Sequence, residues 1–279
     1  MKNFIKKIPG IRWFLDIRRE LALIRFQLTK QTRIQQHIFR EQLISRKTES
    51  GSGFPAAHEQ QTFSQNGEDG ILLEIFSRVG ISKGTFLEIG TGDGNENNTR
   101  LLLELGWSGI WIEGDETSCQ TARNNFAEFI DSGSLRIINA YVTPDDIDDL
   151  LNREGVPKEV DLLSLDIDMD THHVWENMNS LEAKIAVVEY NGFFPSPAKW
   201  KSKYVPGGKW DGTYKVGATL GVLTEIATTK RLRHLGCELT GTNAFFGSIE
   251  IAEEHFPETI QEKDLFEPAR HFLLNDPEH

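Results

Sequence analysis

Acidic and imidazole side chains cluster directly after residues 160–165, an apolar segment that reads as a buried strand. The cluster consists of Asp166, Asp168, Asp170, His172 and His173. A second apolar segment, residues 186–188, is followed by Glu189, Tyr190 and Asn191. Because ligands of open α/β sheets bind beyond the carboxyl ends of the strands, we expect both clusters to face one crevice.

These side chains suit metal and proton-transfer chemistry. Carboxylates of Asp166, Asp168 and Glu189, with the amide oxygen of Asn191, form an all-oxygen shell that suits Mg²⁺ or another divalent cation. Such an ion would bind a hydroxyl group and lower its pKa, and His172 would then accept the proton. We therefore predict Asp166, Asp168 and His172 as catalytic residues. Alternatively, Asp166 and Asp168 face opposite sides of the chain, and only one of the two histidines points into the crevice.

A glycine-rich turn lies upstream of this cluster. Residues 85–89 read as a short strand, residues 101–105 as a helix, and residues 109–112 as a second strand that ends at Glu113. The turn between the first strand and the helix carries Gly90, Gly92 and Gly94. This order is typical of the nucleotide-binding half of a doubly wound sheet, which has a strand, a glycine turn, a helix and an acid at the end of the next strand. An ordinary glycine-rich turn is the alternative.

The spacing of these glycines distinguishes between cofactors. A dinucleotide fingerprint would place its third glycine at position 95, which is Asn95, so the spacing disfavours an NAD-dependent oxidoreductase. The glycines allow the backbone to approach a ligand closely, and the carboxylate of Glu113 can bind a pair of ribose hydroxyls. The predicted cofactor-binding residues are Glu88, Gly90, Gly92, Asp93, Gly94, Glu113 and Asn139.

Strands and helices alternate through the rest of the chain, which predicts an α/β fold with a doubly wound, mostly parallel, seven-stranded Rossmann-like sheet. Further helices are expected at 117–130, 144–153, 173–178 and 218–235, and further strands at 135–139, 160–166, 185–189, 237–240 and 244–249. The expected units are a basic amphipathic helical arm at 1–47, a linker at 48–57, the main domain at 58–250 and a loosely held acidic tail at 251–279.

The arm and the body carry opposite charge. Residues 1–47 hold 12 Lys and Arg against 3 Asp and Glu, whereas the remaining residues hold 18 against 39. An acidic body argues against nucleic acid as a partner. Ile17, Leu21, Ile24 and Leu28 follow helical spacing until Gln31 and Gln35 interrupt it. The arm therefore suits homo-oligomerisation through a short coiled coil, peripheral contact with an anionic membrane surface, or packing on its own domain.

Two cysteines, Cys119 and Cys237, form no disulfide framework or metal pattern, and no apolar run approaches a membrane span. We expect a cytoplasmic protein whose arm is a candidate for contact with the inner face of the membrane.

Residues 191–215 form an irregular, aromatic-rich stretch. Phe193, Phe194, Trp200, Tyr204, Trp210 and Tyr214 suit stacking on a sugar, and Lys199, Lys201, Lys203 and Lys209 suit an anionic acceptor. A structured insertion that packs on the sheet is the alternative.

Six segments together resemble the FkbM-like family of class I S-adenosylmethionine-dependent methyltransferases. They are S-Q-N-G-E-D-G, E-I-G-T-G-D-G-N-E-N-N-T, L-S-L-D-I-D-M-D, V-V-E-Y-N, W-D-G-T-Y and G-T-N-A-F-F, and they span residues 64–247. The resemblance implies S-adenosyl-L-methionine as cofactor, with Glu88 facing its methionine part. It also implies methyl transfer to oxygen, with a bacterial glycan or glycosylated metabolite as the acceptor.

The chain departs from the patterns of such families at two places. Many FkbM-like members read K-I-D-V-E-G where this chain reads S-L-D-I-D-M-D, so Asp166 takes the position of the family's Asp and Asp168 that of its Glu. The metal-dependent catechol-type O-methyltransferases, which the acidic clusters also resemble, carry Asp-Asn where this chain has Glu-Tyr-Asn. A catalytically inactive binding protein of a glycan-assembly complex is the alternative function.

Overall fold

The computed structural model describes residues 9–49, 55–195, 197–206, 212–256 and 265–273. Seven strands form one sheet in the order β3-β2-β1-β4-β5-β7-β6. The strand order reverses at β1, because β2 and β3 follow on one side of it and β4 lies on the other. The strands are β1 (Thr85–Ile89), β2 (Ser108–Glu113), β3 (Leu135–Asn139), β4 (Glu159–Leu165), β5 (Glu182–Glu189), β6 (Leu232–Cys237) and β7 (Asn243–Ser248). The predicted α/β class with a mostly parallel seven-stranded sheet is confirmed.

The parallel part of the sheet places its functional side chains at one edge. β1 pairs in parallel with β2 and β4, β2 with β3, and β4 with β5, whereas β7 runs antiparallel to β5 and β6. The carboxyl ends of β1 to β5 and the first residue of β7 therefore meet along the same edge. Register pairs Glu189 directly with Asn243 there.

Helices cover both faces of the sheet, and alternate strand residues supply two apolar cores. One face packs against α3 (Glu68–Arg78), α4 (Arg100–Glu104), α5 (Glu116–Asn125) and α10 (Ile249–His255). The other packs against α7 (Ile147–Arg153), α8 (Thr171–Asn177) and α9 (Leu220–Thr229). Phe245 faces the first core and Phe246 the second, as period-two alternation requires. The short elements are α6 (Ala127–Asp131) and the 3₁₀ turns Ala56–His58, Asp168–Asp170 and His271–Leu273.

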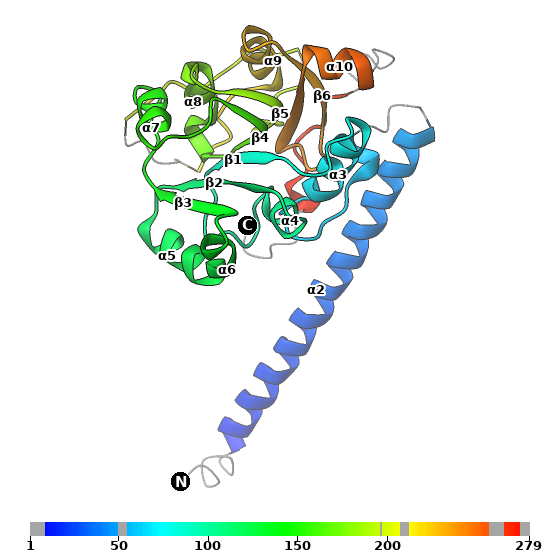
Figure 1. Ribbon diagram of the computed structural model, residues 1–279. Coiled ribbons are helices and arrows are strands. Elements are labelled where there is room, and N and C mark those ends of the chain that lie inside the picture. Colours follow the sequence, from blue (N-terminus) through cyan, green and yellow to red (C-terminus); the bar gives the residue numbers. More distant parts are fainter. Residues whose placement is uncertain (1–8, 50–54, 196, 207–211, 257–264, 274–279) are drawn as a thin grey trace.

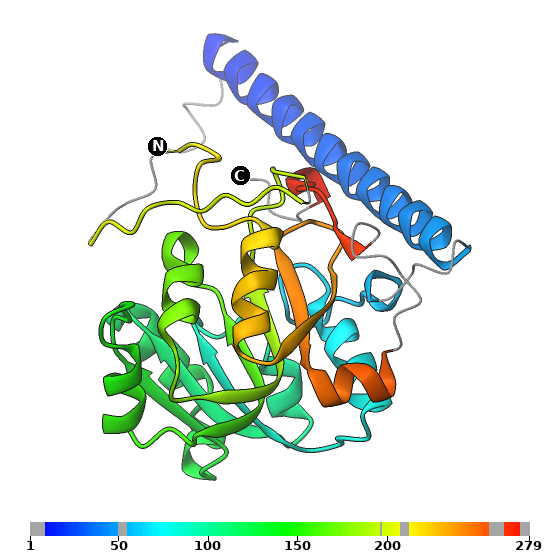
Figure 2. The same cartoon turned by 90° about the horizontal axis from the view of Figure 1, so that it is seen from above.

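The N-terminal arm is one long helix, α2 (Pro9–Glu49). Its C-terminal part contacts the body and its N-terminal part projects away from it (Figures 1 and 2). Large apolar side chains on the projecting part, including Trp13, Leu21 and Phe26, are exposed. None of the described helices is both long enough and apolar enough to cross a membrane.

Several boundaries differ from the sequence-based expectation. The helix expected at 218–235 ends at Thr229, and its last residues form β6 instead, because residues 232–237 pair with β7. The expected helix at 117–130 is split into α5 and α6. The acidic tail expected to be loosely held includes α10, whose Ala252 is buried, and buried Glu267 and Leu273. Residues 50–54 of the expected linker lie outside the described residues, whereas Pro55 packs against Gly236.

Candidate functional site

The glycine turn after β1 adopts a conformation that depends on its glycines. Gly90, Gly92 and Gly94 all have positive φ angles, of 86°, 54° and 81°. A Cβ atom on Gly90 would lie 1.6 Å from the carbonyl oxygen of Asp166, so β1 and β4 can converge only with glycine at this position. The turn is thereby held against the carboxyl end of β4.

Glu113 closes the turn from the neighbouring strand. Its Oε2 accepts a hydrogen bond from the backbone N–H of Gly92 at 2.7 Å, and its Oε1 accepts one from Asp115 at 2.8 Å. A carboxylate has about four lone-pair positions, so these two bonds leave acceptor capacity for ligand hydroxyls. The structure thus brings the glycine turn and Glu113 together, and their binding of a cofactor stays a prediction.

Glu88 is buried and fully bonded to the protein. Its Oε1 accepts from the Asn98 backbone N–H and the Ser164 hydroxyl, both at 2.9 Å, and its Oε2 accepts from the backbone N–H and the hydroxyl of Thr99. Burial raises the pKa of Glu88, and these hydrogen bonds act against that rise. The side chain lines the pocket described below and fixes the loop that leads into α4.

Two further residues predicted to bind a cofactor organise this edge. Asn139 donates to the carbonyl oxygens of Glu113 and Gly114, at 3.0 and 3.2 Å, and so fixes the end of β2 from β3. Asp93 accepts from the backbone and side-chain amides of Asn95, at 3.0 and 2.8 Å. Asp93 lines the pocket, and Asn139 is not among its lining residues.

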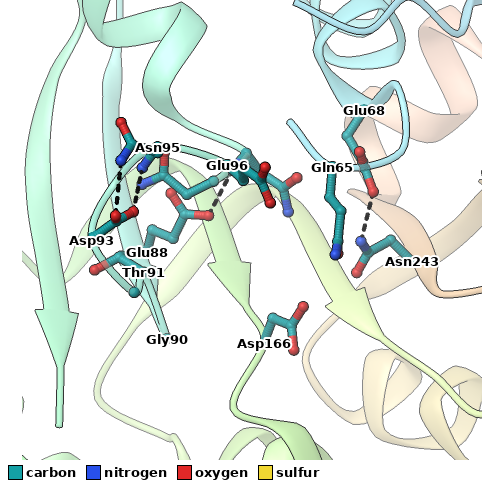
Figure 3. A pocket seen from close by; sticks show the side chains of 13 residues that line it. Gln65, Glu68, Glu88, Gly90, Thr91, Asp93, Asn95, Glu96, Asp166 and Asn243 are labelled. Carbon is teal, nitrogen blue, oxygen red and sulfur yellow. Dashed lines mark hydrogen bonds between the residues drawn. The ribbon is translucent and has the colours of Figure 1, made fainter. Parts of the chain in front are cut away.

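A pocket of about 470 Å³ opens beside the glycine turn. It is lined by Gln65, Glu68, Glu88, Gly90, Thr91, Gly92, Asp93, Asn95, Glu96, Asn97, Asn98, Asp166 and Asn243 (Figure 3). Five lining residues carry carboxyl groups and none is a lysine or arginine. Thr91 Oγ1, both polar side-chain atoms of Asn97, and Asn243 Oδ1 are buried without a hydrogen-bond partner. Because buried polar atoms are normally paired, these atoms fit the polar groups of a ligand.

The pocket wall opposite the glycine turn comes from two segments that carry the family resemblance but in which the sequence analysis named no site residue. Glu68 Oε1 accepts from Asn243 Nδ2 at 2.8 Å, and its Oε2 accepts from the Asn66 backbone N–H at 2.9 Å. Gln65 and Asn243 lie with Glu68 across the cavity from the turn (Figure 3). The wholly polar run at 64–69, next to an apolar helix pattern, was the available signal, because buried polar side chains need a binding or structural role.

Asp166 and Glu189 form a pair of carboxyl groups at the ends of β4 and β5. Burial raises the pKa of Asp166 to about 6, the charge of Asp168 adds to the rise, and a hydrogen bond with Glu189 opposes it. Burial, followed by the charges of Asp166 and Asp168, raises the pKa of Glu189 well above its ordinary range. Both carboxyl groups therefore hold a proton more readily than isolated ones, and Asp166 is the member of the pair that lines the pocket.

The remaining predicted metal ligands have other environments. Asn191 Nδ2 donates to the carbonyl oxygens of Tyr214 and Val216, and its Oδ1 accepts from the Phe193 backbone N–H. Asp168 is exposed and has a φ of 58°, a left-handed conformation that aspartate tolerates. Within the described residues, no group of three or more His, Cys, Asp or Glu side chains has the arrangement of a metal site. The described residues therefore give no support for the divalent cation that the sequence suggested.

His172 lies under the irregular stretch that follows β5. Its Nε2 is 3.4 Å from the Ser202 carbonyl oxygen, which also lies 3.0 Å from His173 Nε2. Burial and the neighbouring His173 lower the pKa of His172 to about 4, so the ring is neutral at physiological pH. His172 is not among the residues that line the pocket, and its role as general base stays a prediction.

The aromatic stretch forms paired rings and ion pairs. Phe193 lies 4.1 Å from Tyr214, and Phe194 stacks on Trp200 at 5.2 Å between ring centroids. Of the lysines expected to favour an anionic acceptor, Lys199 pairs with Glu225 and Lys201 with Glu176, whereas Lys203 is exposed. Lys209 and Trp210 lie outside the described residues.

No protein-family model and no curated protein matches the chain. Similar solved structures are S-adenosylmethionine-dependent methyltransferases. A putative caffeoyl-CoA O-methyltransferase from Staphylococcus aureus is 14% identical over 76% of this chain and 99% of that chain, with a TM-score of 0.46. Magnesium protoporphyrin IX methyltransferase from Synechocystis is 10% identical over 64% of this chain and 76% of that chain, with a TM-score of 0.43. Likenesses at this level assign no ligand or reaction to the chain.

Proposed function

We propose that the chain binds S-adenosylmethionine and transfers its methyl group to a hydroxyl of a carbohydrate-type acceptor. The observation that carries this proposal is a pocket whose lining includes both the glycine turn and Asp166. The turn and the acid of β2 provide the arrangement that suits an adenosine-bearing ligand. The unpaired atoms of Thr91 and Asn97 fit polar ligand groups beside it.

The cofactor supplies an electrophilic methyl group on a sulfonium centre. With that cofactor bound, the carboxylate of Asp166 would accept the proton of the acceptor hydroxyl as its oxygen takes the methyl group, and S-adenosylhomocysteine would be the leaving group. The proton then passes to solvent, which restores the ionised Asp166. A pKa of about 6 suits this role, because a general base works best when its pKa lies near the operating pH.

The far wall of the pocket supports a hydroxyl-rich acceptor. Glu68, Gln65 and Asn243 present amide and carboxyl groups, and the unpaired Oδ1 of Asn243 can accept a hydrogen bond from a hydroxyl. Acceptor hydroxyls placed there would lie across the cavity from the glycine turn (Figure 3). The proposal includes membership of the FkbM-like branch. Two segments of that resemblance, residues 64–70 and 241–246, meet through the Glu68–Asn243 hydrogen bond, which is consistent with it.

Calorimetric titration with S-adenosylhomocysteine and with NAD tests the cofactor. We expect S-adenosylhomocysteine to bind and NAD not to bind. Glu113→Ala should weaken S-adenosylhomocysteine binding by about 1.5–3 kcal/mol, the range for a hydrogen bond to a charged group. Glu128→Ala, an exposed position on α6, is the matched control and should bind as the wild type does. If Glu113→Ala binds S-adenosylhomocysteine as tightly as the wild type does, the proposed cofactor site at this edge of the sheet is wrong.

A further inference from the structure

The N-terminal helix docks on the body through one stripe of its surface. The partly buried residues of its C-terminal part are Gln36, Arg40, Leu43, Ile44 and Lys47, which recur every three to four positions as one helix face does. Gln36 donates to the Phe272 carbonyl oxygen at 2.6 Å, and Lys47 forms an ion pair with buried Glu267. The stripe therefore belongs to the packed structure, in contrast to the exposed surface nearer the N-terminus.

Arg40 is the residue of this stripe that reaches the pocket wall. Its Nη1 donates to Glu59 Oε2 and to the Asn66 carbonyl oxygen, both at 2.6 Å. Glu59 is buried, with 1% of its side chain exposed, and its other oxygen accepts from the backbone N–H of Leu239, just before β7. One guanidinium group thus connects the arm to residues 59–66 and, through Glu59, to the loop before β7.

The segment that Arg40 contacts is closed on itself by hydrogen bonds. Gln60 donates from its backbone to the Gly67 carbonyl, and Gly70 donates to the Gln60 carbonyl. Oδ2 of Asp69 accepts from three successive backbone N–H groups, those of Thr62, Phe63 and Ser64. A displacement at Asn66 is therefore transmitted to its neighbours Gln65 and Glu68, which line the pocket.

Buried acids around this segment favour a cation beside them. Glu68 and Glu238 are buried, and the side chain of Glu59 is 1% exposed. Burial, followed by the charge of Glu68, raises the pKa of Glu238 to about 7. Burial and the charge of Glu238 likewise raise the pKa of Glu59, and Arg40 acts against that rise. Removing one partner of a buried ion pair leaves an uncompensated charge, which is strongly destabilising.

We propose that Arg40 is a positioning residue for the ligand pocket, because it holds Gln65 and Glu68 in the wall by fixing Glu59 and the Asn66 carbonyl. The N-terminal helix is then a structural part of the pocket. The proposal rests on the proposed function only in its choice of ligand, since the geometry of the wall is independent of what the pocket binds.

Hydrogen exchange and ligand titration on the full-length chain test this role with Arg40→Ala, Arg40→Lys and the control Arg33→Ala, an exposed position on the same helix. In Arg40→Ala, the amides of residues 62–66 should exchange at least about tenfold faster, a step of about 1.4 kcal/mol. Its affinity for S-adenosylhomocysteine should fall by a similar factor. Arg40→Lys keeps the charge and should recover part of both effects, and Arg33→Ala should match the wild type.

Wild-type exchange of residues 62–66 in Arg40→Ala would overturn the inference, as would loss of exchange protection spread evenly over the sheet strands. If Arg40→Ala does not fold, the exchange rates of residues 62–66 are compared between Arg40→Lys and Arg33→Ala. Faster exchange in Arg40→Lys alone supports the inference, and equal exchange in both overturns it. Absence of S-adenosylhomocysteine binding by the wild type would overturn the proposed cofactor, and exchange of residues 62–66 would still decide the role of Arg40.

Discussion

The substitution Asp166→Asn tests whether the pKa of Asp166 is raised in the folded protein. The test measures protein stability, so it does not require the methyl acceptor to be known. The pKa of Asp166 rises from its ordinary 3.8 to about 6 in the folded chain. Each pH unit of this difference corresponds to about 1.4 kcal/mol, so ionising Asp166 in the folded state costs up to about 3 kcal/mol. Because the side chain is only partly buried, solvent screening reduces the expected cost to about 1–3 kcal/mol.

The sign follows from the raised pKa. Below pH 3.8 the group is protonated in both states, and as the pH rises through 6 the folded state loses the advantage of holding the proton. Asparagine removes the ionisation, so Asp166→Asn should raise the free energy of unfolding at pH 8 by about 1–3 kcal/mol and change it little at pH 3.5. Denaturant unfolding at both pH values measures the difference. Turnover of the variant should fall about 10²–10⁴-fold once an acceptor is in hand.

Asp161→Asn is the matched control with the opposite sign. Burial acts to raise the pKa of Asp161, but hydrogen bonds from Lys184 and Thr85 outweigh it and lower the pKa. Its stabilisation is therefore present above pH 3.8 and lost as the pH falls, so Asp161→Asn should lower stability at pH 8. If Asp166→Asn is destabilising at pH 8, or its effect is equal at both pH values, Asp166 is not a carboxylate with a raised pKa and the assignment of the base fails.

Two further predictions concern the metal and the arm. Methyl transfer should persist in excess chelator, because the proposed proton acceptor is Asp166 itself; activity that is lost and then restored by Mg²⁺ would instead support the metal set Asp166, Asp168, Glu189 and Asn191. Removal of residues 1–33 should leave S-adenosylhomocysteine affinity unchanged, because the docked stripe begins at Gln36. Sedimentation of both forms, with and without anionic liposomes, separates self-association from contact with a membrane surface.

The sheet and the glycine turn could be predicted because their signals are local. Residues 85–113 contain the strand, the turn, the helix and the closing acid in one continuous run, and the hydrogen bond from Gly92 to Glu113 joins residues only 21 positions apart. Helix ends were less predictable. β6 takes residues with helical spacing, because pairing with β7 outweighs local propensity there.

The pocket wall could not be predicted, because its contacts join distant parts of the chain. Glu68 meets Asn243 across 175 positions, and Glu88 meets Ser164 across 76. The sequence shows the polar residue types at these positions but not their partners. The arm illustrates the same difficulty. Its opposite charge suggested a separate unit, whereas Arg40 forms an ion pair with Glu59 of the body.

The charge of the pocket limits the acceptor. Five lining residues carry carboxyl groups and none carries a basic group, so an anionic group in the cavity would meet like charges. Two like unit charges 4 Å apart repel by about 4 kcal/mol at an effective dielectric constant of about 20. Lys199 and Lys201, which suggested an anionic acceptor, already pair with Glu225 and Glu176. We therefore propose that the reacting part of the acceptor is a neutral polyol, and that any negative group it carries lies outside the pocket.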